Sequence, residues 1–472
     1  MGTDDLAPIE IGSRARSRLS RLKQYLSTRA ISLIPSKTNN KILNPIPALK
    51  SLTTRQWMFF LVAFLGWTWD AFEFFSVALT ASKIADDLAR SVAEITWGIT
   101  VVLMLRSVGA IFFGLLSDKY GRKWPFIGNC VLFVILELAT GFVKTYEQFL
   151  AVRALFGIAM GGIYGNCAAT ALEDCPVIAH GIISGMLQQG YAFGYLLAVV
   201  FSRALVDTTR FGWQPLFWFG AVPPVLIILF RLALPETDAY LSSKSKSRQG
   251  VKEFTREVVD NFRKYWHLIG YMIVLMTGFN FMSHGSQDLY PVMLEVQHEF
   301  TPNRVTVAMV IANVGAICGG TIVGHLSGYL GRRLSVIIAC MIGAGLIYPW
   351  ALPRSDGAIV AVFFLQFMVQ GAWGVIPIYL SELSPRGLRA FVVGVVYQLG
   401  NLASSASSTI EASMGTRFPL EGGDERYDYG KVMGIFMGAV FFFVIVVVFV
   451  GPEKSLEKDD EEEVEAEKRN EQ

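Results

Sequence analysis

Charged residues are scarce in this chain. They make up 17% of the 472 residues, whereas hydrophobic residues make up 53%. A soluble protein of ordinary composition carries about a quarter charged residues. The formal net charge of +2 also provides no overall field that would attract a nucleic acid. The composition therefore argues against a soluble globular protein and against a nucleic-acid partner, and it favours a chain that lies in a lipid bilayer.

Metal-ligand spacing and catalytic clusters are also missing. The 5 cysteines include no spaced pair that resembles a metal site, and most lie in apolar stretches, so neither a disulfide framework nor a metal site is expected. No nucleophile–base set stands out, so we expect no enzyme and no cofactor. The first twenty residues contain no apolar core, and a cleavable signal peptide is not expected.

Long apolar segments dominate what is present. A helix needs roughly 20 apolar residues to cross a hydrocarbon core of about 30 Å. About twelve segments meet this length, so we predict an all-α membrane protein with twelve transmembrane helices. The expected spans are 56–82, 95–117, 124–143, 147–171, 181–206, 212–233, 266–290, 305–328, 334–353, 357–381, 390–412 and 430–450.

Lysine and arginine indicate the orientation of these spans. They crowd the N-terminal tail (1–55), the central loop (234–265) and the loops after the second, eighth and tenth spans. All of these fall on one side if the spans alternate, and the positive-inside rule makes that side cytoplasmic. Both termini are then cytoplasmic, with an acidic tail at 451–472.

A sequence repeat divides the chain into two halves. The segment Gly114–Lys123, GLLSDKYGRK, recurs as Gly324–Arg333, GHLSGYLGRR. Shorter segments recur at similar spacing, which predicts two pseudo-symmetric six-helix bundles at 56–233 and 266–450 with a site between them. Asp118 of the first copy could accept hydrogen bonds from a helix N-terminus or pair with a nearby arginine, and so tie the halves shut on the cytoplasmic side. Arg122 of the same motif is a further gating candidate. The alternative is a turn whose charges only fix the topology; the second copy has Gly328 in place of the acid.

GLLSDKYGRK resembles the loop motif between helices two and three of major facilitator proteins. The resemblance implies the fold of the whole chain, but it says nothing about the substrate. Arg153, in Arg153-Ala-Leu-Phe-Gly157, resembles a second facilitator motif. We interpret Arg153 as a coupling or helix-positioning residue rather than a direct ligand.

The seventh span carries a polar stripe. Asn280, His284 and Asp288 follow each other at i, i+4 and i+8, so they share one helix face, with Ser283 and Gln287 beside it. Such a stripe cannot face lipid and should line an aqueous cavity. His284 changes charge near neutral pH and Asp288 can stabilise its protonated form, so together they could bind a proton and an anion. The alternative is a hydrogen-bonded seam inside the bundle.

Charged residues in the first and second spans are a second group of candidates. Asp70 and Glu73 are three residues apart and could carry protons or meet an arginine, or they could simply brace neighbouring helices. Arg106 lies about midway along the second span. Its planar fork suits a carboxylate substrate, and the alternative is a permanent ion pair with Asp70 or Glu73.

The seventh-span segment also resembles the signature of the fungal Jen carboxylate/proton symporters. Asn280, Ser283, His284, Ser286, Gln287 and Asp288 match that signature, whereas Val292 stands where the family has threonine. The resemblance implies symport of short monocarboxylates such as lactate, pyruvate and acetate, or of dicarboxylates, with a proton at the plasma membrane.

The same resemblance extends to other spans. It covers the Trp67–Phe74 segment of the first span. It also implicates Gln398 and Asn401 in substrate choice, with Phe193 as a steric partner. Gln398 and Asn401 share a face of the eleventh span at i, i+3 and could hydrogen-bond the remote end of a substrate.

These patterns together predict a monomeric symporter of a small carboxylate anion and a proton. It would alternate between outward- and inward-open states, and its seventh helix would bend near Gly285 or Pro291. The alternatives are a dicarboxylate-preferring symporter, a facilitator of sugars or other neutral solutes, and a nutrient sensor built on the same fold.

Overall fold

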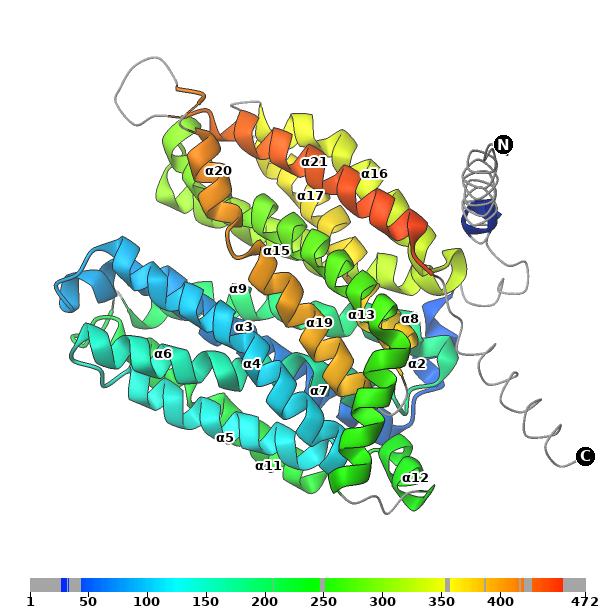
Figure 1. The fold of residues 1–472 in the computed structure, drawn as a ribbon. Coiled ribbons are helices and arrows are strands. Elements are labelled where there is room, and N and C mark those ends of the chain that lie inside the picture. The colour runs from blue at the N-terminus through cyan, green and yellow to red at the C-terminus, as the bar shows by residue number, and fades with distance from the viewer. Residues whose placement is uncertain are drawn as a thin grey trace, which may run out of the picture.

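The protein is almost entirely helical in the computed structural model, which describes residues 27–31, 33, 44–206, 208–246, 251–352, 357–385, 388–415, 417–419 and 427–452. Within these residues the extended structure consists of an isolated bridge between Pro419 and Tyr427. The all-α prediction is therefore confirmed (Figure 1).

Each predicted span of the first half corresponds to one helix or to two consecutive helices. The short helices α2 (Pro45–Lys50) and Val177–Ala179 lie outside these spans. The spans are formed, in order, by α3 (Thr54–Asp87), α4 (Val92–Tyr120), α5 (Lys123–Thr140), α6 with α7 (Tyr146–Gly161, Ile163–Leu172), α8 with α9 (His180–Gln188, Gly190–Leu205) and α10 with α11 (Gln214–Gly220, Val222–Ala233).

The second half follows the same plan, but helix also occupies part of the expected central loop. There α12 (Asp238–Lys246) precedes α13, which starts at Val251. The spans are formed by α13 (Val251–Gln287), α15 (Pro302–Leu330), α16 (Arg332–Ala351), α17 with α18 (Gly357–Trp373, Ile376–Leu383), α19 with α20 (Arg389–Ser404, Ser407–Gly415) and α21 (Tyr429–Val450).

The seventh span is interrupted where a bend was expected. Helix α13 ends at Gln287, between Gly285 and Pro291, and the chain continues as α14 (Tyr290–Val292) and a π-helical turn (Met293–Gln297). Proline lacks an N–H and is tolerated in the first turn of a helix, so Pro291 fits the start of α14.

Within the described residues, 9 helical stretches are long and apolar enough to cross a membrane. The predicted spans outside this set are 181–206, 266–290 and 390–412, formed by α8 with α9, α13, and α19 with α20. These spans are interrupted or polar, and they contain the polar stripe of the seventh span together with Phe193, Gln398 and Asn401. Helices that line an aqueous cavity are expected to be the least apolar, because part of their surface avoids lipid.

Two groups of helices lie side by side in Figure 1, with α3 to α11 in one group and α13 to α21 in the other. They meet where α15 packs on α8 and α9, and where α19 packs on α4 and α7. Glycine allows this approach. A Cβ on Gly165 of α7 would lie 2.2 Å from the carbonyl oxygen of Ala390, and one on Gly185 of α8 would lie 2.5 Å from that of Gly320. The two halves are therefore in backbone contact at both seams.

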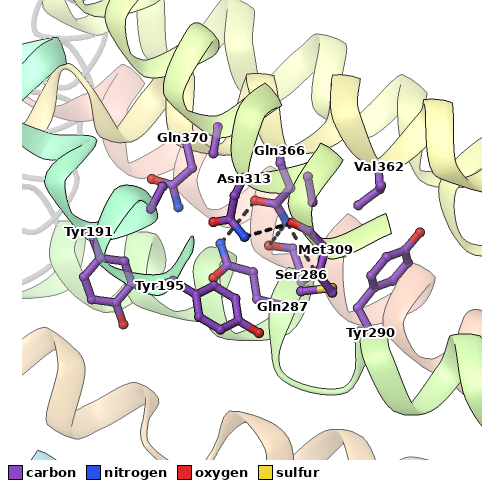
Figure 2. Close-up of a pocket in the computed structure, with 13 residues that line it drawn as sticks. Tyr191, Tyr195, Ser286, Gln287, Tyr290, Met309, Asn313, Val362, Gln366 and Gln370 are labelled. Carbon is purple, nitrogen blue, oxygen red and sulfur yellow. Dashed lines mark hydrogen bonds between the residues drawn. The ribbon is translucent and has the colours of Figure 1, made fainter. Parts of the chain in front are cut away.

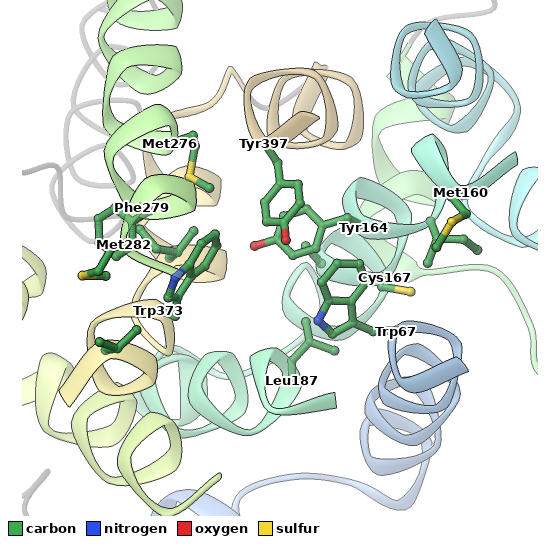
Figure 3. Packing of buried hydrophobic residues seen from close by; sticks show 14 of the residues in the cluster. Trp67, Met160, Tyr164, Cys167, Leu187, Met276, Phe279, Met282, Trp373 and Tyr397 are labelled. Carbon is green, nitrogen blue, oxygen red and sulfur yellow. The ribbon is translucent and has the colours of Figure 1, made fainter. Parts of the chain in front are cut away.

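An aromatic layer joins the halves in the middle of the molecule. It consists of Trp67 and Tyr164 from the first half and Trp373 and Tyr397 from the second, all of them buried (Figure 3). The rings of Tyr164 and Tyr397 stack with centroids 4.1 Å apart, and Trp373 lies 5.7 Å from Tyr397. The contacting rings therefore pack the two halves together at this depth.

Candidate substrate and proton site

A central pocket opens between the two halves beside the aromatic layer. Its empty volume is about 530 Å³, counting the solvent at its mouth. The lining residues are Phe74, Phe75, Leu103, Arg106, Gln188 and Tyr191 from the first half, and Asn280, Ser283, His284, Gln287, Asp288, Gln370, Trp373, Tyr397 and Asn401 from the second. Arg106 and the whole polar stripe of the seventh span therefore share one pocket.

Arg106 is anchored to the pocket wall by an acid. Its side chain is 2% exposed, and its Nη2 donates a hydrogen bond to Asp70 of α3, which is fully buried. Of the two acids expected to meet it, Asp70 does so. The Nε of Arg106 has no hydrogen-bond partner among the described residues. The guanidinium therefore has donor capacity beyond its ion pair, as binding a second carboxylate requires.

His284 bridges two hydrogen-bond acceptors. Its Nδ1 lies 3.0 Å from Oδ2 of Asp288, and its Nε2 lies 3.1 Å from Oδ1 of Asn401 on α19. A neutral imidazole has one N–H and can donate to one of these oxygens, whereas the protonated ring donates to both. The arrangement thus suits a group that gains and loses a proton, because His284 can donate to one of these oxygens when neutral and to both when protonated.

The rest of the stripe continues into a second, smaller pocket, shown in Figure 2. Gln287 donates from Nε2 to Oε1 of Gln366 at 3.1 Å, and Gln366 donates to Oγ of Ser286 at 3.2 Å. Asn280 lines the central pocket, but its amide donates to the Met276 carbonyl of its own helix at 2.8 Å. The polar face predicted from sequence therefore serves two neighbouring pockets, which share Gln287.

Glu73 and Arg153 lie away from both pockets, in a buried cluster within the first half. Arg153 donates from Nη2 to Glu137 at 3.2 Å and to Thr140 at 2.7 Å, which ties α6 to α5. Glu73 is fully buried, and neither carboxyl oxygen has a hydrogen-bond partner among the described residues. The contacts of Arg153 fit its interpretation as a helix-positioning residue, and Glu73 lines neither pocket.

Gln398 and Phe193, the other two candidates for substrate choice, are placed differently from Asn401. Gln398 is fully buried at the α4–α19 seam, where its backbone carbonyl accepts a hydrogen bond from Ser107 at 3.3 Å. Phe193 is 36% exposed and stacks on Phe64, with ring centroids 6.1 Å apart. Neither side chain lines either of these two pockets. Asn401 alone of the three is brought to the central pocket.

The first copy of the repeated loop motif ties the two halves together. Asp118 accepts hydrogen bonds from the backbone N–H groups of Phe391 at 2.9 Å and Ala390 at 3.3 Å, at the start of α19. Arg122 donates to Asp118 and to Glu173, both at 2.6 Å. Burial lowers the pKa of Arg122, but the carboxylates of Glu173 and Asp118 outweigh burial and raise the pKa above its ordinary value. We call the end of the molecule that holds these contacts the latch end, and the opposite end the distal end.

The second copy makes a different contact. Arg332 pairs with Glu382 at 2.8 Å, as Arg122 pairs with Glu173, but no acid stands at Gly328. Instead α15 approaches the start of α8 closely, where a Cβ on Gly181 would lie 2.7 Å from the carbonyl oxygen of Gly324. The seam between α4 and α19 is thus held by charged groups at the latch end, whereas the seam between α8 and α15 is held by close helix packing.

Sequence reasoning missed several residues of this region. Glu137 and Glu411 are ionisable residues within predicted spans, so the rule that found Arg106 would also have found them. Tyr191 and the aromatic layer carry no such signal, because an aromatic residue in a bundle is most often packing.

Comparison with known proteins identifies the class. Residues 43–462 match the family described as "Sugar (and other) transporter". The chain belongs to this family, and it is therefore a multi-pass membrane transporter and not an enzyme.

Individual relatives narrow the class. The chain is 43% identical over 456 residues to the "Carboxylic acid transporter protein homolog" of Saccharomyces cerevisiae, covering 92% of this chain and 74% of that protein. This chain is thus a homologue of a carboxylic acid transporter, which confirms the resemblance noted from its motifs.

Solved structures share the fold. The major facilitator proton:xylose symporter XylE superposes with a TM-score of 0.68 at 17% identity, over 85% of this chain and 96% of that chain. The human organic anion transporter MFSD10 gives a TM-score of 0.65 at 13% identity, over 84% of this chain and all (100%) of that chain. The major facilitator fold is therefore confirmed.

Proposed function

We propose that this protein is a proton-coupled symporter of short carboxylates of the lactate, pyruvate and acetate class. The observation that carries the proposal is one pocket lined both by Arg106, with donor capacity to spare, and by His284, held between two acceptors. The yeast relative is named a carboxylic acid transporter homolog, which supports the substrate class.

Charge balance explains why an anion and a proton would travel together. With the acids ionised and His284 neutral, Arg106, Asp70, His284 and Asp288 sum to one negative charge. A monocarboxylate would add a second negative charge beside the buried Arg106–Asp70 pair, which is costly. A proton on His284 cancels that charge, so the loaded and empty sites carry the same net charge.

Alternating access requires the two ends of the pocket to open in turn. The Asp118 contacts and the aromatic layer close the latch end, and transport requires both to separate while the distal end closes. The basic residues of the repeated loops support a cytoplasmic latch end. We accordingly propose a plasma-membrane monomer with both termini in the cytoplasm.

We also propose a division of the chain into two bundles, a loop and two tails. The bundles span 56–233 and 266–450, joined by a cytoplasmic loop at 234–265 and flanked by cytoplasmic tails at 1–55 and 451–472. Most of both tails lies outside the described residues.

Uptake of radiolabelled lactate in a transport-null cell tests the coupling. We expect an inward proton gradient to drive accumulation, and Asp288→Asn to abolish that accumulation while exchange of internal for external lactate persists, since the anion site remains. Asp86→Asn is the matched control, because Asp86 is an exposed acid at the distal end of α3. Accumulation that continues unchanged after a protonophore collapses the gradient would overturn the proposal.

A substrate panel tests the class itself. Lactate and pyruvate should compete with each other more strongly than succinate does, and sucrose should not compete. Sucrose uptake that does not depend on pH would instead favour a facilitator of neutral solutes.

A further inference from the structure

The second pocket adjoins the central one, and the proposed coupling does not use it. Its empty volume is about 380 Å³, counting open solvent, and it shares Tyr191, Gln287 and Gln370 with the central pocket. It lies between the two halves, because α9 of the first half supplies Tyr191 and Tyr195, while α13, α15 and α17 of the second half supply most of the other lining residues. A substrate too long for the central pocket would therefore extend into this one.

The second pocket differs from the central one in charge. The central pocket holds Arg106, His284 and Asp288, whereas none of the described residues that line the second pocket is charged. Ligand pockets commonly combine an apolar wall with a few placed polar groups. Here the apolar part includes Met309 and Val362, and Figure 2 shows the polar part, in which amide side chains lie close together. These amides belong to Gln287, Asn313, Gln366 and Gln370.

Backbone carbonyl groups fix which way these amides face. Asn313 donates from Nδ2 to the Met309 carbonyl at 2.9 Å, and Gln366 donates from Nε2 to the Ser286 carbonyl at 3.3 Å. Because a carbonyl only accepts, the nitrogen of each amide must lie on that side. The oxygen of Gln366 then accepts from Nε2 of Gln287 at 3.1 Å. The side-chain oxygens of Asn313 and Gln287 are left as acceptors, and no hydrogen bond from the described residues reaches them.

This arrangement selects the chemistry of a ligand. Two free acceptor oxygens favour a group that donates a hydrogen bond, such as a hydroxyl or a primary amide. An ionised carboxylate has only acceptors, so it would leave those oxygens unpaired and would lie in a pocket whose described lining supplies no cation. Asp288, which follows Gln287 in the chain and lines the central pocket, would repel it further.

We propose that the second pocket is a subsite for the far end of longer monocarboxylates that end in a neutral hydrogen-bond donor, and that it rejects the second carboxylate of dicarboxylates. The subsite rests on the proposed function, because the carboxylate of the same substrate would be held at Arg106. The methylene chain between the two ends would pass Tyr191 and Gln287, which line both pockets.

Calorimetric titration of the purified protein with a matched set of ligands tests the subsite. Succinamate, the half-amide of succinate, has a neutral donor at its far end, whereas pentanoate has an apolar end. Lactate, whose hydroxyl lies beside its carboxylate, is the reference for the Arg106 end. At about pH 7 both carboxyl groups of succinate are ionised. Succinamate should then bind at least about tenfold more tightly than succinate, the equivalent of one charge-assisted contact.

Asn313→Leu removes an acceptor from the second pocket and nearly conserves the volume of the side chain. The ratio of succinamate affinity to pentanoate affinity should fall roughly five- to tenfold, the value of one neutral hydrogen bond. Asn129→Leu is the matched control, because Asn129 is a buried asparagine on α5 that lines neither pocket. That control should keep the wild-type ratio.

Met309→Lys tests the same subsite by a gain of binding, and it decides the question if Asn313→Leu does not fold. Lysine is unbranched like methionine, and its ammonium group would supply a cation to the second pocket. Succinate affinity relative to lactate should rise by about tenfold or more in this variant. Met309→Gln, which is polar but uncharged, should show no such rise.

Two results would overturn the subsite: a wild-type ratio of succinamate to pentanoate affinity in folded Asn313→Leu, or unchanged discrimination against succinate in folded Met309→Lys. Lactate separates these outcomes from the proposed function. If the ratios follow Asn313 and Met309 but lactate uptake ignores the proton gradient, the subsite stands and the symport proposal fails. If lactate uptake is proton-driven but the ratios do not change, symport stands and the subsite fails.

Discussion

At the residue scale, the guanidinium of Arg106 combines charge with geometry. Lysine keeps the charge but loses the planar fork that can bond Asp70 and a substrate carboxylate together. We expect Arg106→Lys to weaken lactate binding by roughly ten- to a hundred-fold, or about 1.5–3 kcal/mol, the usual value of a charge-assisted hydrogen bond. Calorimetric titration of the purified, folded variant measures this change.

Arg153 supplies the matched control for that experiment. It is equally buried in the same half, but it pairs with Glu137 and lines neither pocket. Arg153→Lys should leave lactate affinity unchanged, whatever it does to stability. Affinity of the wild-type strength in Arg106→Lys would mean that Arg106 is a structural ion-pair member, and the anion site would have to be sought at His284.

The sequence identified the segments that hold the candidate side chains, but it did not show which of two neighbouring residues reaches the site. The cost of a charge in lipid singled out Arg106 and His284, and both line the central pocket. It did not separate Asp70 from Glu73, or Asn401 from Gln398. Three residues along a helix advance about 4.5 Å and end about 60° short of a full turn. Whether both residues of such a pair reach the pocket depends on how the helices cross: Asn280 and Ser283 both line it, whereas Gln398 does not.

At the scale of helices, the apolar spans were predictable, and so was a bend in the seventh span near Gly285 or Pro291, but the other interruptions were not. Hydropathy gave the length and order of α3, α4 and α5 closely. It did not indicate that five other spans are each divided into two helices, because a break at Gly162, Gln189 or Ala221 leaves the apolar composition intact. The start of α13 within the expected central loop was missed for the opposite reason, since its first turns are polar and resemble a loop.

The seam between α7 and α19 offers a test of how closely helices must pack. A methyl group at Gly165 would overlap the Ala390 carbonyl oxygen, which belongs to the turn of α19 that bonds Asp118. Gly165→Ala should therefore weaken the latch and lower stability by about 1–3 kcal/mol, the usual cost of overpacking. Thermal unfolding of the purified protein measures this loss.

Gly128 on α5 is the matched control, because a Cβ there would meet nothing within 4 Å. Gly128→Ala should leave the unfolding temperature unchanged or raise it slightly, since alanine is the better helix former. Equal unfolding temperatures for the two variants would mean that the α7–α19 seam adjusts freely and does not determine the closed state.

At the scale of the whole molecule, charge balance in the pocket fixes what the transport cycle does to the membrane potential. Arg106, Asp70, His284 and Asp288 carry one net negative charge when empty, and the same charge when a proton and a monocarboxylate are bound. Because moving a net charge across a membrane costs about 2.3 kcal/mol per 100 mV, an unchanged total makes the cycle insensitive to voltage. We therefore expect lactate uptake into proteoliposomes to respond to a pH difference but not to an imposed potassium diffusion potential, with one proton entering per lactate.

Succinate, if it enters as a dianion with one proton, should instead be slowed by an inside-negative potential. A lactate-driven current of either sign would contradict this assignment and require another titrating group in the cycle, for which Glu73 and Glu411 are the buried candidates.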